Sequence, residues 1–526
     1  MSFSTLIMAA GEGKRMHSKQ AKVCHELLGR PLIRWIINAA QAAGSEQVIT
    51  VVGQGREQVA PLVEDTVVVV QEEPLGTGHA VMSARGELER LAAAGAGGAG
   101  AGAAGAAVAG GAGAGGAGAA GAAVAGGAGG GGAVAGAAVP TASVAATLPD
   151  APPFSPLSSL VVLNGDTPLI SPQTIAALVQ TQQQQAAAVC LLAHNADDPG
   201  GYGRVIVDDQ GGFLRVVEDK DASPDEKCVR LCNSGAYCFD LPLLLASLEH
   251  LNNNNAQHEY YLTQVLELFV QGGQRVAVQV VDEAEAQGVN DRKQLAEATR
   301  TMQGRINDAW MLAGVTMLDP RAVWIGPDVE LEQDVELLPQ TLLSGRTQVG
   351  RGSVIGPNTR ITDSRIGRDC LVDESILISC ELEDQVKCGP RAFLRAGTLL
   401  KNGAKAGTHV EIKNSTIGAG SKVPHLSYLG DATVGRDVNI GAGTITCNYD
   451  GQEKNPTIIG DRAFIGSNTM FVAPVQVGAD TVTGAGSTIT RNVPDGALGL
   501  ERSEQKTIMD WAEKHRKGKQ GQRDGE

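Results

Sequence analysis

The chain of 526 residues has few aromatic residues, no paired cysteine motif and no surplus of positive charge. Phe, Trp and Tyr make up only 3% of it, so its cores must rely on Leu, Ile and Val, which suffice for at least two domains. The nine cysteines are odd in number and form no Cys-x-x-Cys pair, as expected for reduced thiols in a cytoplasm. The net charge of −15 argues against nonspecific nucleic-acid binding, so anionic ligands must be held by local basic groups.

Charge is also missing from one long stretch, Leu91 to Pro149, which consists mostly of Gly, Ala and Val. An 11-residue block occurs twice within it, at 103–113 and 119–129. Gly-rich sequence is a poor helix former and only weakly apolar, so we expect a flexible insert at about 92–146 and no membrane span. The N-terminus has no basic region leading into an apolar core, so we expect a protein that is not exported.

The first motif follows a short apolar run, which reads as a buried strand ending near Ala10. Gly11 and Gly13 then open a tight turn that lets backbone N–H groups approach a phosphate. Arg15 and Lys22 add positive charge where phosphate oxygens would lie. The spacing resembles the signature of sugar-1-phosphate nucleotidyltransferases; the alternative is a plain strand-to-helix turn.

Residues 1–292 alternate between strand and helix patterns. The predicted strands are 48–52, 67–70 and 160–163, and the predicted helices are 32–43 and 79–91. This order predicts an α/β domain with helices on both faces of a mostly parallel sheet. Ligands of such sheets bind at the carboxyl ends of the strands, where the Gly11 turn and Asp166 both fall. Asp166 is the best candidate for a Mg²⁺ ligand of a nucleotidyl-transfer site, and the alternative is a turn or helix-capping residue.

The second half has a period of six. Apolar residues recur at Ile459, Ile465, Phe471, Val477, Thr483 and Ile489 with a threonine at one step, and glycine follows four of them. This period is neither helical nor that of an alternating strand, and it predicts a parallel β-helix over 314–526 instead of a β-sandwich. Residues 293–313 have near-helical spacing and predict a linker helix.

The segment Lys422–Gly430 interrupts the period, so we expect a loop that leaves the coil and carries His425. Acetylation of an amino sugar needs a neutral amine, and histidine titrates in the range to accept its proton. A lone histidine is more often structural, and this alternative stays open from the residues alone.

Several further motifs complete a resemblance that covers nearly all of the chain. They are Gln71 with Leu75–Ala80, Asn164–Asp166, Gly201–Arg204, Glu218, Asn233, Gly288–Asn290 and the run Asn439–Asp450. The chain resembles the bacterial bifunctional N-acetylglucosamine-1-phosphate uridyltransferase/glucosamine-1-phosphate N-acetyltransferase family. The resemblance implies a Rossmann-like nucleotidyltransferase domain followed by a left-handed parallel β-helix of hexapeptide repeats.

The resemblance also assigns the first site. It implies that the uridine nucleotide contacts Met8, Ala9, Ala10, Gly11, Lys22, Gln71, Gly76 and Thr77. Arg15 belongs to the same phosphate-binding group. The sugar would be held by Gly203, Glu218 and Asn233, and Mg²⁺ by Asp166 and Asn290. The attacking phosphate is already an anion, so alignment and charge neutralisation should suffice without a general base.

In the second half the resemblance implies that His425 is the catalytic base. The amino-sugar phosphate would be bound by Arg395, Lys413, Tyr428, Asn439 and Asn448. Acetyl-CoA would be bound by Ala442, Tyr449, Ser467, Ala485 and Arg502.

The chain departs from the family pattern at several positions. Gln20–Ala21 stand where Leu-Pro usually precedes the lysine, and Asn164 stands where tyrosine is common. Pro424 replaces a usual glycine, and Glu501 replaces a small residue beside Arg502. The run Gly484–Gly486 also differs slightly from the family pattern at its first residue. The changes at Gln20–Ala21 and Asn164 leave the charged groups of the first site intact, whereas Glu501 places an acid near an anionic cofactor.

The leading hypothesis is a two-site, homotrimeric cytoplasmic enzyme. The second site would acetylate glucosamine 1-phosphate, and the first would join that product to UTP, releasing pyrophosphate and UDP-N-acetylglucosamine for peptidoglycan and lipopolysaccharide. The alternatives are a single-activity nucleotidyltransferase whose β-helix serves assembly, and a non-catalytic nucleotide-sugar sensor. Lys22, Asp166, Asn290 and His425 are all present, which counts against both alternatives.

Overall fold

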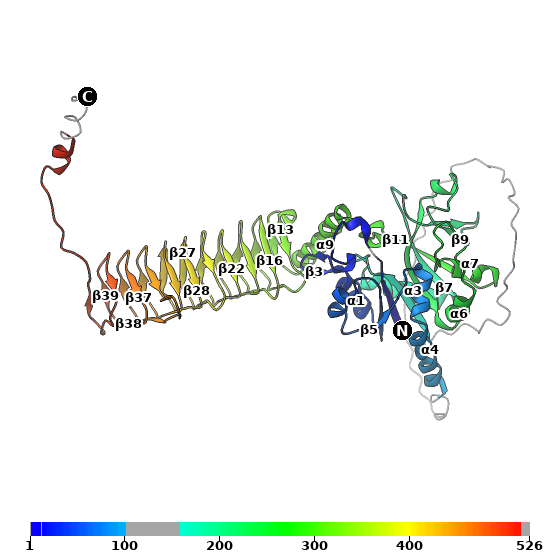
Figure 1. The fold of residues 1–526 in the computed structure, drawn as a ribbon, viewed down its shortest axis with the longest axis horizontal. Coiled ribbons are helices and arrows are strands. Elements are labelled where there is room, and N and C mark those ends of the chain that lie inside the picture. Colours follow the sequence, from blue (N-terminus) through cyan, green and yellow to red (C-terminus); the bar gives the residue numbers. More distant parts are fainter. Residues whose placement is uncertain (1, 12, 101–157, 517–526) are drawn as a thin grey trace, which may run out of the picture. The chain divides into compact units, whose positions relative to one another are not determined.

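The computed structural model describes residues 2–11, 13–100 and 158–516. The chain divides into two compact units, the first comprising Met1–Leu27 and Pro31–Ala298 and the second Leu28–Arg30 and Thr299–Glu526. We call them the N-terminal and C-terminal units and describe each by itself (Figure 1). Most of the predicted insert, from residue 101 onward, lies outside the described residues.

The N-terminal unit is built on a mostly parallel sheet of order β11-β7-β10-β6-β1-β4-β5. Its strands are β1 (Phe3–Ala9), β4 (Val48–Val52), β5 (Val67–Val70), β6 (Ser159–Asn164), β7 (Val189–Asn195), β10 (Leu231–Asp240) and β11 (Val276–Val281), with β8 (Arg204–Val207) and β9 (Phe213–Val217) attached to β10. The central strands β1, β4, β5 and β6 are parallel, whereas β10 runs antiparallel to β6 and β7. The short strands β2 (Glu26–Leu27) and β3 (Arg30–Pro31) pair with each other. The predicted strands and the mostly parallel sheet are confirmed.

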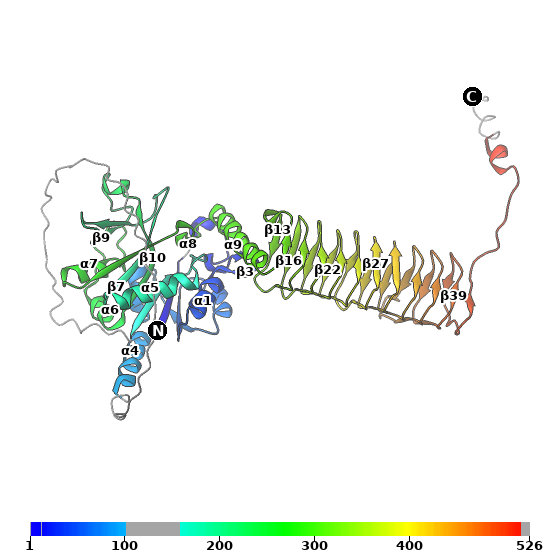
Figure 2. The ribbon, with the colours of Figure 1, turned by 180° about the vertical axis from the view of Figure 1, so that it is seen from behind.

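Helices cover both faces of this sheet (Figure 2). One core joins residues of α1 (Leu32–Ala42) and α5 (Pro172–Gln184) to one face, and a second core joins α3 (Thr77–Ser83), α6 (Leu241–Ser247) and α7 (Gln264–Gln271) to the other. The remaining helices of the unit are α2 (Arg56–Val59), α4 (Arg85–Gly100) and α8 (Glu283–Ala286). This arrangement is the predicted one, and it leaves the carboxyl ends of β1, β4 and β6 at one edge.

The helix predicted over 79–91 is divided at Ala84 into α3 and α4, and α4 continues to Gly100. The chain therefore remains helical over residues 92–100, at the start of the expected insert. Arg85 is paired with Glu89 at 2.7 Å and Arg90 with Glu87 at 2.8 Å, which supports the first turns of α4. Propagating an existing helix into alanine-rich sequence costs far less than nucleating one, which explains the extension.

The main segment of the C-terminal unit begins within α9 (Arg292–Leu312), a helix that covers most of the expected linker at 293–313. The chain then forms a coil whose turns stack along one axis, so that the short strands of successive turns line up in three parallel sheets. The first sheet contains β12 (Thr316–Met317), β15 (Glu336–Leu337), β18 (Val354–Ile355), β21 (Leu371–Val372), β24 (Lys387–Cys388), β27 (Lys405–Thr408), β30 (Lys422–His425), β33 (Asn439–Ile440), β36 (Phe464–Ile465), β39 (Val482–Thr483) and β41 (Leu498–Gly499).

The other two sheets complete each turn of the coil. The second contains β13 (Val323–Ile325), β16 (Thr341–Ser344), β19 (Arg360–Thr362), β22 (Ile376–Ile378), β25 (Phe393–Leu394), β28 (Glu411–Lys413), β31 (Tyr428–Gly430), β34 (Ile445–Cys447), β37 (Met470–Val472) and β40 (Thr488–Ile489). The third contains β14 (Glu330–Leu331), β17 (Gln348–Val349), β20 (Arg365–Ile366), β23 (Glu381–Leu382), β26 (Leu399–Leu400), β29 (Thr416–Ile417), β32 (Ala432–Val434), β35 (Thr457–Ile459) and β38 (Val475–Val477). The stack is consistent with the expected left-handed β-helix of hexapeptide repeats.

The six-residue period arises because each short strand buries one apolar side chain in a single continuous core. Ile355, Ile361 and Ile366 are buried in this way on three consecutive strands of one turn. Small residues make the corners: a Cβ added at Gly441 would lie 2.5 Å from the Ser467 backbone nitrogen of the next turn. Glycine is therefore required there by the close approach of successive turns.

The interruption predicted at Lys422–Gly430 does not leave the coil. Lys422–His425 forms β30, in which His425 pairs with Thr408, and Tyr428–Gly430 forms β31. The true excursion lies further on, between β34 and β35, where Tyr449 and Lys454 form an isolated antiparallel bridge. The polar segment 422–430 keeps its register because the buried Val423, Ser427 and Leu429 still fill the core positions.

Candidate functional sites

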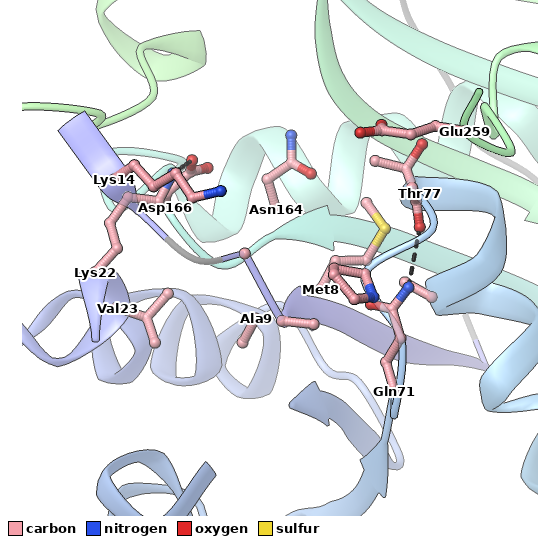
Figure 3. A pocket seen from close by; sticks show the side chains of 15 residues that line it. Met8, Ala9, Lys14, Lys22, Val23, Gln71, Thr77, Asn164, Asp166 and Glu259 are labelled. Carbon is pink, nitrogen blue, oxygen red and sulfur yellow. Dashed lines mark hydrogen bonds and ion pairs between the residues drawn. The ribbon is translucent and has the colours of Figure 1, made fainter. Parts of the chain in front are cut away.

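A cavity of about 440 Å³ lies at the carboxyl ends of β1 and β6 in the N-terminal unit (Figure 3). It is lined by Met8, Ala9, Ala10, Gly11, Lys14, Lys22, Val23, Gln71, Pro74, Gly76, Thr77, Ala80, Asn164, Asp166 and Glu259. The lining includes every residue predicted to contact the nucleotide except Arg15 and Asn290. The backbone at the strand ends is close-packed: Gly165 N donates to Met8 O at 2.8 Å, and a Cβ on Gly165 would lie 2.9 Å from that oxygen.

Charged and amide side chains converge at one wall of this cavity. The Lys22 ammonium contacts the Asp166 carboxylate, and its Nζ also lies 3.2 Å from Asn290 Oδ1. Arg15 Nη2 donates to the same Asn290 oxygen at 2.9 Å. Val289 N donates to Asp166 O at 2.8 Å, so the backbone itself holds these two segments together. Residues separated by more than a hundred positions are thus gathered around one cationic group.

Asp166 and Asn290 form a donor set suited to Mg²⁺. Both offer oxygen atoms, which are the ligands that this hard cation prefers. In the structure the Lys22 ammonium lies between those oxygens, so the site already accommodates positive charge there. Among the described residues, no group of three or more His, Cys, Asp or Glu side chains is arranged to hold a metal. A cation at this position would therefore need substrate oxygens or water to complete its shell.

The opposite wall of the cavity is made by the segment 71–80 and by residues 259–260. Tyr260 N donates to Leu75 O at 2.8 Å, and Gly78 N donates to Tyr260 O at 2.7 Å. Gly76 has φ +102°, and a Cβ there would lie 2.7 Å from Tyr260 O, so this position requires glycine. Sequence reasoning missed Glu259, because its pairing across about 180 residues leaves no spacing signal. It also passed over Lys14, although the signal was available beside Arg15.

The three residues predicted to hold the sugar form their own group. Asn233 N donates to Gly203 O at 2.8 Å, and a Cβ on Gly203 would lie 3.4 Å from a Glu218 carboxylate oxygen. Burial raises the pKa of Glu218, and a hydrogen bond from Thr263 at 3.3 Å opposes that rise. None of the three lines the nucleotide cavity itself.

In the C-terminal unit, a positive cluster forms on neighbouring turns of the second sheet. Arg395 N donates to Ile412 O, which places Arg395 beside Lys413, and its guanidinium is paired with Glu411 at 2.8 Å. A hydrogen bond with Lys454 lowers the pKa of Lys413, and the nearby positive charges add to this effect. Lys454 comes from the excursion between β34 and β35 and was not anticipated from the sequence. The cations of this cluster repel one another, and an anionic ligand would reduce that repulsion.

Beside these cations lie the predicted sugar contacts of the second site. Asp431 accepts hydrogen bonds from Asn414 at 2.6 Å and from Asn448 at 2.5 Å. Burial raises the pKa of Asp431, but these bonds and the neighbouring lysines leave it below its usual value. A Cβ on Gly430 would lie 2.4 Å from the Tyr428 hydroxyl and 2.7 Å from Asn448 Nδ2, so Tyr428 and Asn448 meet over a glycine.

The exposed side chain of His425 belongs to the first sheet, on the turn next to that of Asn439. Their strands β30 and β33 are paired through Lys422 and Asn439. Ser427 Oγ donates to the His425 carbonyl at 2.8 Å, which fixes the backbone at the end of β30. His425 is thus held on a regular strand instead of the loop expected from the sequence.

Three of the residues predicted to contact acetyl-CoA stack along one corner of the coil. Asn468 N donates to Ala442 O at 2.6 Å, Gly486 N donates to Ser467 O at 2.8 Å, and Arg502 donates to Ala485 O at 3.1 Å. Ala442, Ser467 and Ala485 therefore occupy equivalent places on successive turns. Tyr449 is 61% exposed on the excursion. The Glu501 carboxylate accepts from Thr488 N at 3.3 Å, so this acid is engaged by the backbone.

Comparisons with known proteins agree with this architecture. A profile described as MobA-like NTP transferase domain matches residues 5–96, one described as Nucleotidyl transferase matches 130–311, and six repeats described as Bacterial transferase hexapeptide match 456–491. The Bifunctional protein GlmU of Heliobacterium modesticaldum is 43% identical over 519 residues, which is 98% of this chain and 99% of that protein. The Bifunctional protein GlmU of Desulfitobacterium hafniense is 40% identical over 517 residues, 98% of this chain and 99% of that protein.

The fold and its matches define a nucleotidyltransferase domain joined to a hexapeptide-repeat transferase, and hence an enzyme with two transferase activities. At this level of identity over nearly the full length, the chain belongs to the GlmU family of bifunctional transferases. Within residues 2–11, 13–100 and 158–516, no helix combines the length and apolarity needed to cross a membrane.

Proposed function

We propose that the enzyme makes UDP-N-acetylglucosamine in two consecutive transfers. The C-terminal unit acetylates glucosamine 1-phosphate with acetyl-CoA, and the N-terminal unit transfers uridylate from UTP to the resulting N-acetylglucosamine 1-phosphate. We assign the second step to residues 1–292 and the first to 314–526, joined by the helix at 293–313. The observation that carries the proposal is the convergence of Lys22, Asp166 and Asn290 at the mouth of the phosphate-binding turn.

In the uridyl transfer, an oxygen of the sugar phosphate attacks the α-phosphorus of UTP, and the bond to the leaving pyrophosphate breaks. The nucleophile is already an anion, so catalysis consists of alignment and charge neutralisation. The Gly11 turn approaches the phosphates with its backbone, and Arg15 and Lys22 supply positive charge. Mg²⁺, held by Asp166 and Asn290, would neutralise the phosphate oxygens when bound. Lys22 would then exchange its contact with Asp166 for a phosphate oxygen.

The remaining contacts of this site set its specificity. Met8, Ala9, Ala10, Gln71, Gly76 and Thr77 line the cavity and would surround the nucleoside. Gly203, Glu218 and Asn233 lie together and would hold the N-acetylated sugar. Because this group is separate from the cavity lining, the nucleotide and the sugar would be recognised by different walls of the site.

In the acetyl transfer, the sugar amine attacks the thioester carbonyl of acetyl-CoA, and the coenzyme leaves as its thiolate. His425, exposed at the end of β30, would accept the amine proton. Arg395 and Lys413 would bind the sugar phosphate, with Tyr428, Asn439 and Asn448 around the ring. Ala442, Ser467 and Ala485 would bind acetyl-CoA along their common corner, together with Tyr449 and Arg502. The positive cluster at Arg395 and Lys413 supports a dianionic substrate there.

We further propose a cytoplasmic homotrimer, since UTP and acetyl-CoA are cytoplasmic metabolites and the nine cysteines, all within the described residues, are free thiols. An apolar row on the first sheet of the β-helix supports assembly. Phe464 pairs with Val482 and Val482 with Leu498, and these side chains are 54%, 43% and 64% exposed. Such a row is suited to contact with another copy of the chain.

The decisive experiment is an assay that scores free thiol and pyrophosphate separately. Acetyl-CoA with glucosamine 1-phosphate should release thiol, and UTP with N-acetylglucosamine 1-phosphate and Mg²⁺ should release pyrophosphate. Pyrophosphate without any thiol would favour a single-activity nucleotidyltransferase whose β-helix serves assembly. Neither product would favour a nucleotide-sugar sensor.

A further inference from the structure

The side chain of Gln71 is fixed by two hydrogen bonds from the same nitrogen atom. Gln71 directly follows β5, its backbone N–H donates to Val52 O at 2.8 Å, and the residue is only 5% exposed. Its Nε2 lies 3.2 Å from Gly76 O and 3.0 Å from His79 Nδ1. Figure 3 shows Gln71 at the wall of the cavity, with its bond toward the segment of Gly76 and Thr77.

These partners determine which way the amide faces. A carbonyl oxygen can only accept, so Gly76 O must face the NH₂ group and not the amide oxygen. The second hydrogen of Nε2 then meets His79 Nδ1, which accepts it when the ring carries its hydrogen on Nε2. Both hydrogens of the amide are thereby used inside the protein. The atom left for a ligand is Oε1, which has no protein partner within the described part of the chain and can only accept.

His79 is itself held in place. It lies in the first turn of α3, its carbonyl accepts from Ser83 Oγ at 2.8 Å, and its ring lies 6.3 Å from that of Tyr260. Gly76, the other partner, is constrained by its positive φ and by Tyr260 O. The two acceptors that orient Gln71 therefore sit on backbone and ring positions that cannot readily turn away.

We propose that His79 is a positioning residue which, with the Gly76 carbonyl, locks the Gln71 amide so that the site selects a nucleobase presenting an N–H donor. The proposal rests on the uridyl transfer proposed above and explains how the site would discriminate between pyrimidines. Uracil presents an N–H at position 3, which Oε1 can accept. Cytosine presents a lone pair at that position, which Oε1 would repel. His79 acts through Gln71 and need not touch the nucleotide.

The test measures kcat/KM for UTP and for CTP by pyrophosphate release with N-acetylglucosamine 1-phosphate. His79→Leu removes the acceptor at Nδ1 and should lower the ratio of UTP to CTP efficiency about tenfold, the usual effect of an unsatisfied buried donor. His79→Asn can place an acceptor oxygen near the same point and should keep the ratio within about threefold of wild type. His250→Leu, at an exposed position of the same unit, is the matched control and should leave the ratio unchanged.

The outcomes separate this proposal from the proposed function. Equal losses for UTP and CTP in His79→Leu would show a merely structural role and overturn the lock. If His79→Leu does not fold, wild type assayed with 3-methyluridine 5′-triphosphate keeps the proposal open to refutation. This nucleotide lacks the N–H and should be used at least about a hundredfold less efficiently than UTP, and equal use would overturn the lock. No pyrophosphate from wild type with any nucleoside triphosphate would instead refute the uridyl transfer itself.

Discussion

At the scale of single residues, each site depends on groups whose neighbours set their charge. Lys22 neutralises Asp166 and shares Asn290 with Arg15, so removing one of these side chains leaves a charge or a hydrogen-bonding group of the others without its partner. In the other unit, Lys454 lowers the pKa of Lys413, and the Asp431 carboxylate opposes that shift. These arrangements predict effects confined to one reaction at a time.

Asp166→Ala should abolish pyrophosphate release and leave acetyl transfer intact. The substitution removes an oxygen donor of the proposed Mg²⁺ site and the partner of Lys22. Both activities would be assayed on one preparation, with Asp209→Ala as a control at an exposed position of the same unit. Unchanged uridyl transfer in Asp166→Ala would remove this residue from the metal site.

His425→Ala should reduce acetyl transfer by about two to four orders of magnitude, the usual contribution of a general base. Thiol release with glucosamine 1-phosphate is the measurement. Uridyl transfer from supplied N-acetylglucosamine 1-phosphate should persist in the same sample and serves as the internal control. Acetyl transfer close to wild type would mean that another group accepts the proton.

Glu218 should make stability depend on pH. Burial raises its pKa above the usual value, so the folded chain binds this proton more readily than the unfolded chain. The stability it contributes is present below the unfolded pKa and is lost as the pH rises through the raised folded value. Glu218→Gln should therefore raise the melting temperature relative to wild type more at pH 8 than at pH 4. Glu64→Gln, at an exposed site, should show no such difference.

At the scale of elements, the sequence was most predictive where a period was long and uniform. The strands ending before Gly11 and Asp166 and the turns of the coil were foreseeable, because each buries a regular set of apolar side chains. The sequence was least predictive where polar residues kept the register. Lys422–Gly430 looked like an interruption, yet Val423, Ser427 and Leu429 still fill core positions.

Long-range pairing accounts for the other misses. Glu259 reaches the nucleotide cavity because Tyr260 bonds to Leu75 and Gly78, a contact that no local pattern signals. Lys454 reaches Lys413 because one turn of the coil is longer than its neighbours: Tyr428 pairs with Ile445, whereas Ile445 pairs with Met470. Spacing can identify such residues only after the register of the turns is known.

Gly460→Ala should destabilise the β-helix by about 1–3 kcal/mol, the usual cost of overpacking. A Cβ at Gly460 would lie 2.5 Å from the Ala479 backbone nitrogen on the next turn, and backbone cannot move aside as a side chain can. Gly304→Ala is the matched control, because it lies in α9 with open space around its Cβ position and should gain helix propensity. Denaturant unfolding followed by circular dichroism would compare them, and equal stability of the two variants would contradict the packing argument.

At the scale of the whole molecule, the two units differ in whether their proposed sites need a second copy of the chain. The nucleotide cavity lies within the N-terminal unit, so we expect uridyl transfer to proceed in a single copy. Of the predicted acetyl-CoA residues, Ala442, Ser467 and Ala485 instead lie along a corner of the coil, and Tyr449 is 61% exposed on the excursion after β34. An exposed cofactor site of this kind would be completed by a neighbouring chain, in keeping with the apolar row at Phe464, Val482 and Leu498.

Assembly should therefore control one activity and not the other. We expect light scattering to give three times the chain mass of 54.3 kDa at working concentration. On serial dilution, acetyl transfer per chain should fall in parallel with the loss of trimer, because its cofactor site would lose the neighbouring copy. Uridyl transfer per chain should stay constant over the same range, since its cavity is formed within one unit. A monomer that retains full acetyl transfer would show that the second site is complete in a single chain.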